Sequence, residues 1–443
     1  MLRLNKTGIQ ELNKIAVPLI IQNISGFLIG FVDEMFIGRI STEAYGAIGI
    51  AASLMFFIAG VFSYTAVAFN IIGSRKSGEN DTEGFRTSLT ASLLIDVLVG
   101  VMYAIIVIIL GKFIFSTIYG LSDEALKAAM IYIYITSPYM LFQMVIFTFN
   151  SYYKIRKETS RIMWASTGAA ILNTVLDYVL IFGKCGMKPL GVAGAATASI
   201  ISVFANMIFY IWGGRRDMDS ILRNRHKYRH IYKKEICNLI RISLPLAGEE
   251  LLEGSVFVVV INAMIAKTGI MEIGAYLLVK KVLDMVMIPM FMYGSAALTL
   301  VSEKIGQKDK NKVKDITNMS VLIAQVIFAL LSVIVIFFRR QVPRLISADE
   351  ELIAFAGMIV IPMVIMNLFN PVQTIYKYVL QAYGDGSFVL YSTAVINLTV
   401  LGFIILLYKA APRIEVIFVG LFFNYMFSCI FYMYRYKNRL KET

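Results

Sequence analysis

Acidic and amide side chains stand inside long apolar stretches of this sequence, where an ionised carboxylate is costly. Asp33 lies in the first stretch, and Asn173 and Asp177 lie in the fifth. Their spacing of four places Asn173 and Asp177 on one face of a helix, one turn apart. Thr197 adds a hydroxyl in the sixth stretch. Two carboxylates, an amide oxygen and a hydroxyl suit a small cation such as Na⁺, and the two acids without a metal would share a proton.

Two further residues in the first half bear on this site. Pro18 precedes Asp33 by fifteen residues, and a proline within a helix removes a backbone hydrogen bond and favours a kink. Asp96, in the third apolar stretch, is either a second partner of the site or a packing residue between helices. Asp33 and Asp177 also have a structural alternative, in which each only hydrogen-bonds a neighbouring helix.

The second half carries an unusual group of charges in its apolar stretches. The charged residues are Glu249, Glu250, Glu253, Lys280, Lys281, Asp284 and Lys377, and the amide side chain of Asn370 is associated with them. Buried charges must neutralise one another or line water. We expect either a polar substrate pocket for zwitterionic or charged compounds, or an ion-pair network that holds or gates this half.

The composition predicts an all-α integral membrane protein. Hydrophobic residues make up 58% of 443 residues, charged residues make up 16%, and the mean hydropathy is +0.71. At roughly 21 residues per span, this apolar share corresponds to about twelve transmembrane helices. The apolar stretches lie at 12–38, 45–73, 87–116, 125–153, 160–183, 190–213, 240–267, 272–301, 315–338, 351–381, 386–408 and 414–434.

The two halves resemble each other. KIAVP at 14–18 matches RISLP at 241–245, and the loop around Gly78 matches the loop around Gly306 at an offset of 228. We therefore expect two pseudo-symmetric six-helix bundles, an N-lobe at 1–213 and a C-lobe at 240–443, joined by a basic linker at 214–239. Duplicated bundles of this kind are typical of transporters that alternate access around a central site.

The positive charges are distributed as the positive-inside rule expects. Twenty-eight Lys and Arg residues fall in the segments on one side of the predicted helices, against eleven on the other. Both termini and the linker are therefore predicted to be cytoplasmic, in a multi-pass protein of the plasma (inner) membrane. Because the net charge of +13 is spread over short loops, no nucleic-acid partner is expected. Three scattered cysteines predict no disulfide framework.

Several segments resemble the multidrug and toxic compound extrusion (MATE) transporters. VPLIIQNISGFLIGFVDEMFIGRIS resembles their first helix, and AILNTVLDYVLIFG followed by PLGVAGAATAS resembles their fifth and sixth. The resemblance extends over nearly the whole chain. It implies a monomeric antiporter without a cofactor, which takes Na⁺ or H⁺ inward and exports small organic, often cationic, compounds.

The resemblance also assigns residues. Asp33, Asn173, Asp177 and Thr197 fall on the N-lobe cation site of the DinF-type branch, and Pro18 falls on its kinking proline. Glu253 matches a seventh-helix glutamate of the NorM-type branch. The aspartate that partners it in that branch is Asn370 here, and an amide cannot carry charge or a titratable proton. The coupling ion is therefore expected in the N-lobe.

Two other classes of protein share some of these sequence features. An intramembrane enzyme is disfavoured because both histidines, His226 and His230, lie in the linker. YGDGS at 383–387 only superficially resembles an aspartyl-protease motif, and the sequence contains no Walker motif. A lipid-linked oligosaccharide or lipid flippase of the same superfamily is the nearer alternative. Its members often have fourteen helices and a cationic cavity, whereas this chain predicts twelve helices and an acidic N-lobe.

Overall fold

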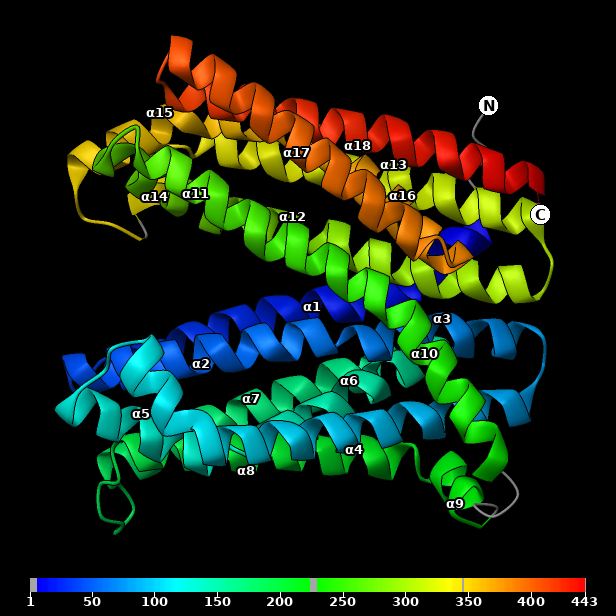
Figure 1. The fold of residues 1–443 in the computed structure, drawn as a ribbon, viewed down its shortest axis with the longest axis horizontal. Helices are drawn as coiled ribbons and strands as arrows, with labels where there is room; N and C mark the ends of the chain where they lie inside the picture. The colour runs from blue at the N-terminus through cyan, green and yellow to red at the C-terminus, as the bar shows by residue number, and fades with distance from the viewer. Residues whose placement is uncertain (1–5, 224–228, 345, 443) are drawn as a thin grey trace. The chain divides into compact units, whose positions relative to one another are not determined.

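The computed structural model describes residues 6–223, 229–344 and 346–442, and within these ranges every regular element is helical. The first half contains α1 (Lys6–Ile37), α2 (Thr42–Phe62), α3 (Tyr64–Gly78), α4 (Thr82–Phe113), η1 (Ile114–Ile118), α5 (Asp123–Ile135), α6 (Tyr139–Ile155), α7 (Thr159–Phe182), α8 (Val192–Gly213) and α9 (Arg215–Arg223). The second half contains α10 (Arg229–Glu250), η2 (Leu251–Phe257), α11 (Val258–Ala266), α12 (Ile270–Gly306), α13 (Lys310–Phe337), α14 (Gln341–Arg344), α15 (Glu350–Met366), α16 (Asn370–Tyr383), α17 (Gly386–Ala410) and α18 (Ile414–Glu442) (Figure 1). The elements η1 and η2 are π-helical turns.

The twelve predicted apolar stretches each coincide with a helix or with two or three consecutive helices. Among the described residues, nine continuous helices are long and apolar enough to cross a membrane, and two bent pairs, α5 with α6 and α15 with α16, raise this number to eleven. The remaining predicted span, 240–267, corresponds to α10, η2 and α11, and it contains three glutamates, Glu249, Glu250 and Glu253. The chain is an all-helical multi-span membrane protein.

The bent pairs are the fourth predicted span of each half. α5 and α6 meet at 49°, and α15 and α16 meet at 43°. Pro138 immediately precedes α6, and Pro371 occupies the first turn of α16. Proline lacks an amide donor and disfavours helical geometry in the residue before it, so each helix ends ahead of its proline and a new one begins.

The repeated loop between the second and third spans has the same local structure in both halves. Asn80 and Lys308 adopt left-handed backbone conformations, with φ of 59° and 57°. The next residue caps the following helix: Asp81 accepts from the amide of Gly84 at 2.8 Å, and Asp309 accepts from the amide of Lys312 at 3.0 Å. Both pairs are separated by 228 residues, the offset seen in the sequence, so the repeat extends to individual caps.

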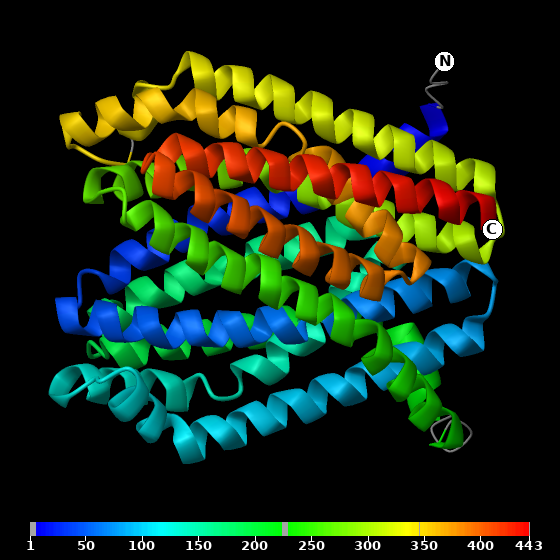
Figure 2. The ribbon, with the colours of Figure 1, turned by 45° about the horizontal axis from the view of Figure 1, so that its top comes forward.

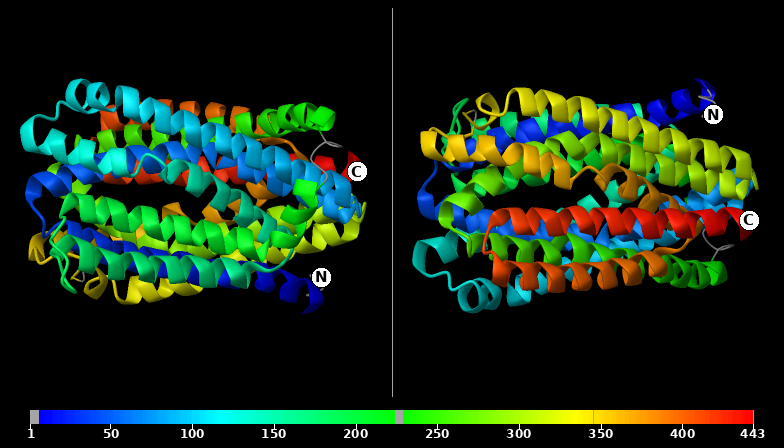
Figure 3. Two further views of the ribbon diagram at one scale, coloured as in Figure 1. Left: turned by 90° about the horizontal axis from the view of Figure 1, so that it is seen from below. Right: turned by 90° about the horizontal axis from the view of Figure 1, so that it is seen from above.

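The described residues cluster into two compact units. Unit 1 comprises Met1–Ile20, Ser77–Glu79 and Leu244–Thr443, and unit 2 comprises Ile21–Lys76 and Asn80–Ser243. In unit 1, α18 runs along α17 and also packs on α16 and α15 (Figure 2). In unit 2, α7 runs along α8, and α4 packs on α6 (Figure 3). α1 begins and α18 ends at the same end of unit 1.

Each unit has its own apolar core. In unit 1, the core includes Ile261, Met363 and Ile417, and in unit 2 it includes Ala51 and Met144, all fully buried or nearly so. Small residues at helix contacts let backbones approach closely, which is the main source of helix packing in a membrane.

The predicted basic linker is helical on both sides of residues 224–228. α9 occupies its first part, and α10 continues from Arg229 into the seventh predicted span. His230 belongs to α10, whereas His226 lies outside the described residues.

Candidate functional site

The two membrane acids of the first half lie together. Asp33 on α1 and Asp177 on α7 lie close enough for their carboxylates to interact. Asn173 donates its side-chain amide to Asp177 Oδ2 at 2.8 Å, across the one turn of α7 that their spacing predicts. The Thr174 hydroxyl donates a longer hydrogen bond, of 3.4 Å, to Asp33 Oδ1. Asp177 is almost completely buried, with 3% of its surface exposed.

The charge of this acid pair is not balanced by a neighbouring cation. Within the described part of the chain, no Lys or Arg side chain forms an ion pair with Asp33 or Asp177. The phenol of Tyr132 on α5 lies close to both acids and to Ser199 on α8. Two carboxylates with neutral donors around them are a site that a proton or a small cation would complete.

Close packing of α7 on α8 brings the fifth and sixth predicted spans together. A Cβ atom at Gly194 would lie 2.7 Å from the carbonyl carbon of Leu180, so glycine is required for this approach. Thr197 lies one turn further along α8, but its hydroxyl donates to the carbonyl of Ala193 at 2.7 Å. Thr197 is therefore on the neighbouring helix without a direct hydrogen bond to either acid in this state.

Two other predicted residues of the first half occupy different places. Pro18 lies within α1, which is continuous from Lys6 to Ile37. Asp96 on α4 is completely buried beside Thr148 of α6, one turn from the Ser92–Thr148 hydroxyl contact of 2.8 Å. Among the described contacts, none joins Asp96 to Asp33 or Asp177. Its role, as a second partner of the site or as a packing residue, stays a prediction.

The charges of the second half form a buried ion-pair network. The ammonium of Lys377 on α16 lies 2.9 Å from Glu249 Oε1 on α10 and 2.9 Å from Glu253 Oε2 in η2. Glu249 is 1% exposed, and the side chain of Lys377 is 13% exposed. The π-helical turn inserts an extra residue and redirects the side chains of η2, as such turns commonly do at functional sites. One ammonium between two carboxylates leaves acid in excess.

A cavity of about 270 Å³ opens beside this network, entirely within unit 1. Its polar lining includes Glu250, Glu253, Lys280, Asp284, Asn367, Asn370, Gln373, Thr374, Lys377 and Asn424, and its apolar lining includes Tyr276, Phe257, Met287, Met363 and Met366. Lys280 and Asp284 pair across one turn of α12 at 2.7 Å. Lys281 is exposed and does not line the cavity.

Asn370 is held in an amide network on one wall of the cavity. Its amide donates to Asn367 at 2.9 Å, and its oxygen accepts from Gln373 at 3.0 Å and from Thr374 at 3.2 Å. These partners are neutral. Asn370 therefore supplies no carboxylate to this cavity, and the carboxylates that line it come from α10, η2 and α12.

Thr174 and Tyr132 were not anticipated from the sequence. Thr174 had a local signal, because it stands three residues before Asp177 and hence on the same helix face. Tyr132 had none, because only tertiary packing brings α5 to α7 and α8. Among the described residues, no group of three or more His, Cys, Asp or Glu side chains is gathered as a metal site, so any bound cation would rely on amide and hydroxyl oxygens beside the two acids.

The site lies in a duplicated membrane fold, and the similarity of the chain to known proteins identifies its family. The family model described as MatE matches residues 18–179 and again residues 245–406. The two matches begin at Pro18 and Pro245, 227 residues apart, which confirms the internal duplication. The chain therefore belongs to the MatE family, a family of multidrug efflux transporters and not of enzymes.

Individual relatives are distant in sequence but cover most of the chain. A probable multidrug resistance protein NorM of Photorhabdus laumondii is 24% identical over 88% of this chain and 85% of its own length. An uncharacterized transporter of Bacillus subtilis, YisQ, is 26% identical over 84% of this chain and 82% of its own. The multidrug resistance protein NorM of Vibrio cholerae is 22% identical over 88% of this chain and 84% of its own.

Solved structures share the fold. The outward-facing conformation of a multidrug resistance MATE family transporter superposes with a TM-score of 0.86, at 17% identity, over 98% of this chain and 96% of that chain. A transporter of the same superfamily from Pyrococcus furiosus gives a TM-score of 0.84, at 18% identity, over the same shares of both chains. The all-helical, multi-span architecture predicted from the sequence is the fold of these structures.

Proposed function

We propose that this protein is a cation-coupled antiporter of the DinF-type branch, which takes up Na⁺ or H⁺ and exports small organic compounds by alternating access. The observation that carries the proposal is the proximity of Asp33 to Asp177, to which Asn173 donates a hydrogen bond. Among the described residues, no Lys or Arg side chain forms an ion pair with either acid. A pair of acids with neutral partners gains from a proton or Na⁺, whereas a salt-bridged pair would not.

The proposed coupling follows from the charge of this pair. A cation at Asp33, Asn173 and Asp177, with Thr197 as a further oxygen ligand after a rotamer change, would cancel the repulsion between the acids. α1 would then rearrange near Pro18 and change the conformation of the proposed N-lobe (1–213). Coupling requires only that the ion and the exported compound favour opposite conformations, by a few kcal/mol in total.

We further propose the cavity of unit 1 as a place where the exported compound binds. Its excess of carboxylates over ammonium groups favours a cationic or zwitterionic compound, and its methionine and aromatic lining adapts to different shapes. Asn370 cannot take up charge, so this cavity of the proposed C-lobe (240–443) holds substrate and not the coupling ion.

The proposed setting is the inner membrane of a bacterial cell, since relatives of this chain are bacterial multidrug resistance proteins. Both termini and the linker 214–239 are proposed to face the cytoplasm, because that side carries most of the Lys and Arg residues. Each chain contains both halves of the repeat, so we propose that the monomer is the working unit.

The decisive experiment is transport by the purified full-length protein in proteoliposomes, with Na⁺ and H⁺ gradients imposed separately. Ethidium movement driven by at least one inward ion gradient is the expected result. A flippase, the alternative from the sequence, predicts instead that small organic cations do not stimulate ion counterflow. Ethidium movement indifferent to both gradients would overturn the antiporter assignment.

A further inference from the structure

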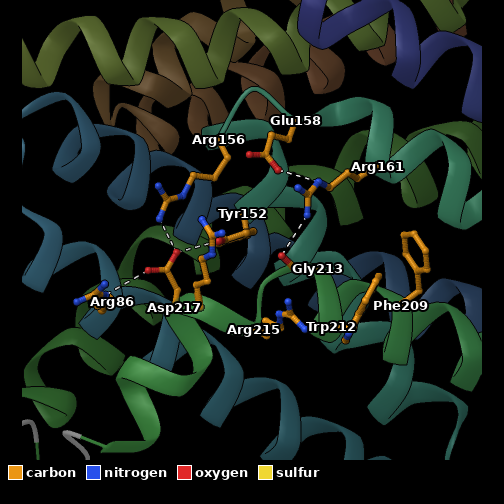
Figure 4. Close-up of a pocket in the computed structure, with 11 residues that line it drawn as sticks. Arg86, Tyr152, Arg156, Glu158, Arg161, Phe209, Trp212, Gly213, Arg215 and Asp217 are labelled. Atoms are coloured by element: carbon orange, nitrogen blue, oxygen red, sulfur yellow. Dashed lines mark hydrogen bonds and ion pairs between the residues drawn. The ribbon is translucent and has the colours of Figure 1, made fainter.

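A basic pocket lies at the ends of several helices of unit 2. Its residue on α7, Arg161, lies at the start of this helix, whereas Asp177 of the acid pair lies near its end. The pocket has a volume of about 640 Å³, and its lining contains five arginines against two carboxylates. The lining comprises Arg86, Tyr152, Arg156, Glu158, Arg161, Phe209, Trp212, Gly213, Arg215, Arg216 and Asp217 (Figure 4). All of these residues belong to unit 2.

Asp217 organises one side of this pocket. It is buried on α9 and accepts from Arg86 Nε at 3.2 Å, from the Tyr152 hydroxyl at 2.8 Å, and from Arg156 (Figure 4). The guanidinium of Arg156 also lies over the rings of Phe85 and Tyr152. These contacts fix the cationic wall in place before any ligand arrives. Glu158 similarly pairs with Arg161 at 2.9 Å.

Two arginines remain available for a ligand. Arg215 and Arg216 are exposed at the start of α9, and the described part of the chain supplies neither a hydrogen bond nor an ion pair to either guanidinium. Arg215 stacks over the ring of Trp212, 5.5 Å from its centre. Their free donors, beside three arginines already held by acids, fit the oxygens of a phosphate group.

The pocket also has an apolar edge that a soluble anion would not need. Phe209 and Trp212 lie in the last turns of α8, a helix apolar enough to span the membrane, and they are 43% and 62% exposed. Tryptophan at the end of a span is typical of the lipid–water interface. The charged wall comes from the starts of α4, α7 and α9 and the end of α6, on the side where the charge count predicts the cytoplasm.

We infer that this pocket binds the phosphate headgroup of an anionic phospholipid of the inner leaflet, with Arg215 and Arg216 on the phosphate and Trp212 against the lipid chain. Basic pockets at helix ends on the cytoplasmic side are suited to such headgroups. The chemical group that the pocket would recognise is an anionic phosphate. A lipid headgroup is one source of such a group, and soluble phosphate is the other.

Tryptophan fluorescence provides a direct test. The sequence contains two tryptophans, so Trp164→Phe leaves Trp212 as the single reporter. The full-length variant is reconstituted into phosphatidylcholine vesicles with a minority of brominated phosphatidylglycerol, or with the same share of brominated phosphatidylcholine. We expect stronger quenching by the anionic lipid. Equal quenching by both lipids would overturn the inference.

Charge variants separate the pocket from general surface attraction. Arg215→Gln with Arg216→Gln should reduce the preference for brominated phosphatidylglycerol by about 30-fold, as expected when two arginines that contact an anionic lipid are removed. Arg215→Lys with Arg216→Lys should retain part of it. The matched control, Lys233→Gln with Lys234→Gln, removes the same charge from exposed positions of α10 outside the pocket and should retain it fully.

Two results would contradict the lipid assignment. An equal loss in the Lys233 and Lys234 control would mean that net charge alone attracts the lipid. Complete displacement of the anionic-lipid quenching by inorganic phosphate would mean that the pocket binds a soluble anion. Each sample is compared with its own unbrominated vesicles, so the removal of Arg215 from the Trp212 ring does not affect the ratio.

Discussion

Asn173 donates to Asp177 across one turn of α7, at 2.8 Å, so the acid that faces Asp33 is held by a neutral amide. An arginine in that place would have neutralised Asp177 permanently. A neutral donor orients the carboxylate while leaving its charge for an exchangeable partner. The acid pair of unit 2 is in this respect unlike the charged group of unit 1, where the ammonium of Lys377 lies between two carboxylates.

Asp177→Asn tests the acid pair. The amide preserves the shape of the side chain but removes the charge that attracts a cation, so we expect normal folding and at least about a 10-fold loss of ion-driven ethidium efflux, the order of a typical coupling free energy. Efflux is measured in proteoliposomes, and monodisperse elution reports folding. Asp96→Asn is the matched control, another buried acid outside the pair, and should have a milder effect. Normal extrusion by the Asp177 variant would contradict the proposed coupling.

Asn370→Asp tests where the coupling ion binds. The change adds a carboxylate to the cavity that Glu253 also lines. We nevertheless expect the ion dependence of transport to change little, because Asp33 and Asp177 are proposed to set it. Transport is compared under separate Na⁺ and H⁺ gradients. A new, strong Na⁺ dependence would assign ion coupling to the proposed C-lobe (240–443) instead.

Lys377→Met tests whether the ion-pair network of unit 1 holds its helices together. Removing the ammonium leaves Glu249 and Glu253 unpaired in a mostly buried place, and breaking such a pair typically costs about 3–5 kcal/mol. We expect a clear fall in the thermal unfolding temperature in detergent. Adding Glu249→Gln should recover part of the loss, because one buried charge then disappears. Equal unfolding temperatures for Lys377→Met and the unchanged protein would exclude a stabilising role.

The membrane architecture was largely predictable, because each span must be a long apolar helix. The breaks within the fourth span of each half were missed, although Pro138 and Pro371 were visible signals. The proximity of Asn173 to Asp177 followed from helical spacing. The pairing of Lys377 with both Glu249 and Glu253 did not follow from helical spacing, since it depends on where the fold places α16 relative to α10 and η2. For the same reason, the contacts of Asp217 with Arg86 and Arg156 could not be predicted, because these residues come from three separate parts of the sequence.

Asp217 offers a test of stability against pH outside the membrane spans. Burial tends to raise the pKa of Asp217, but the hydroxyl of Tyr152 and the guanidiniums of Arg156 and Arg86 outweigh burial and hold the pKa below its ordinary value. A lowered pKa in the folded state stabilises the protein above the unfolded value of about 4, and this contribution is lost as the pH falls through the folded-state pKa.

Asp217→Asn should therefore lower the unfolding free energy at neutral pH by about 2 kcal/mol, the order for hydrogen bonds to a charged group. The difference between the variant and the unchanged protein should shrink as the pH is lowered below about 4. The measurement is thermal unfolding in detergent over an acidic-to-neutral series. Asp219→Asn, at an exposed position of the same helix, is the control and should leave the profile unchanged. A difference between Asp217→Asn and the unchanged protein that stays constant down to the most acidic sample would contradict the assignment, because it would show that the carboxylate contributes nothing through its charge.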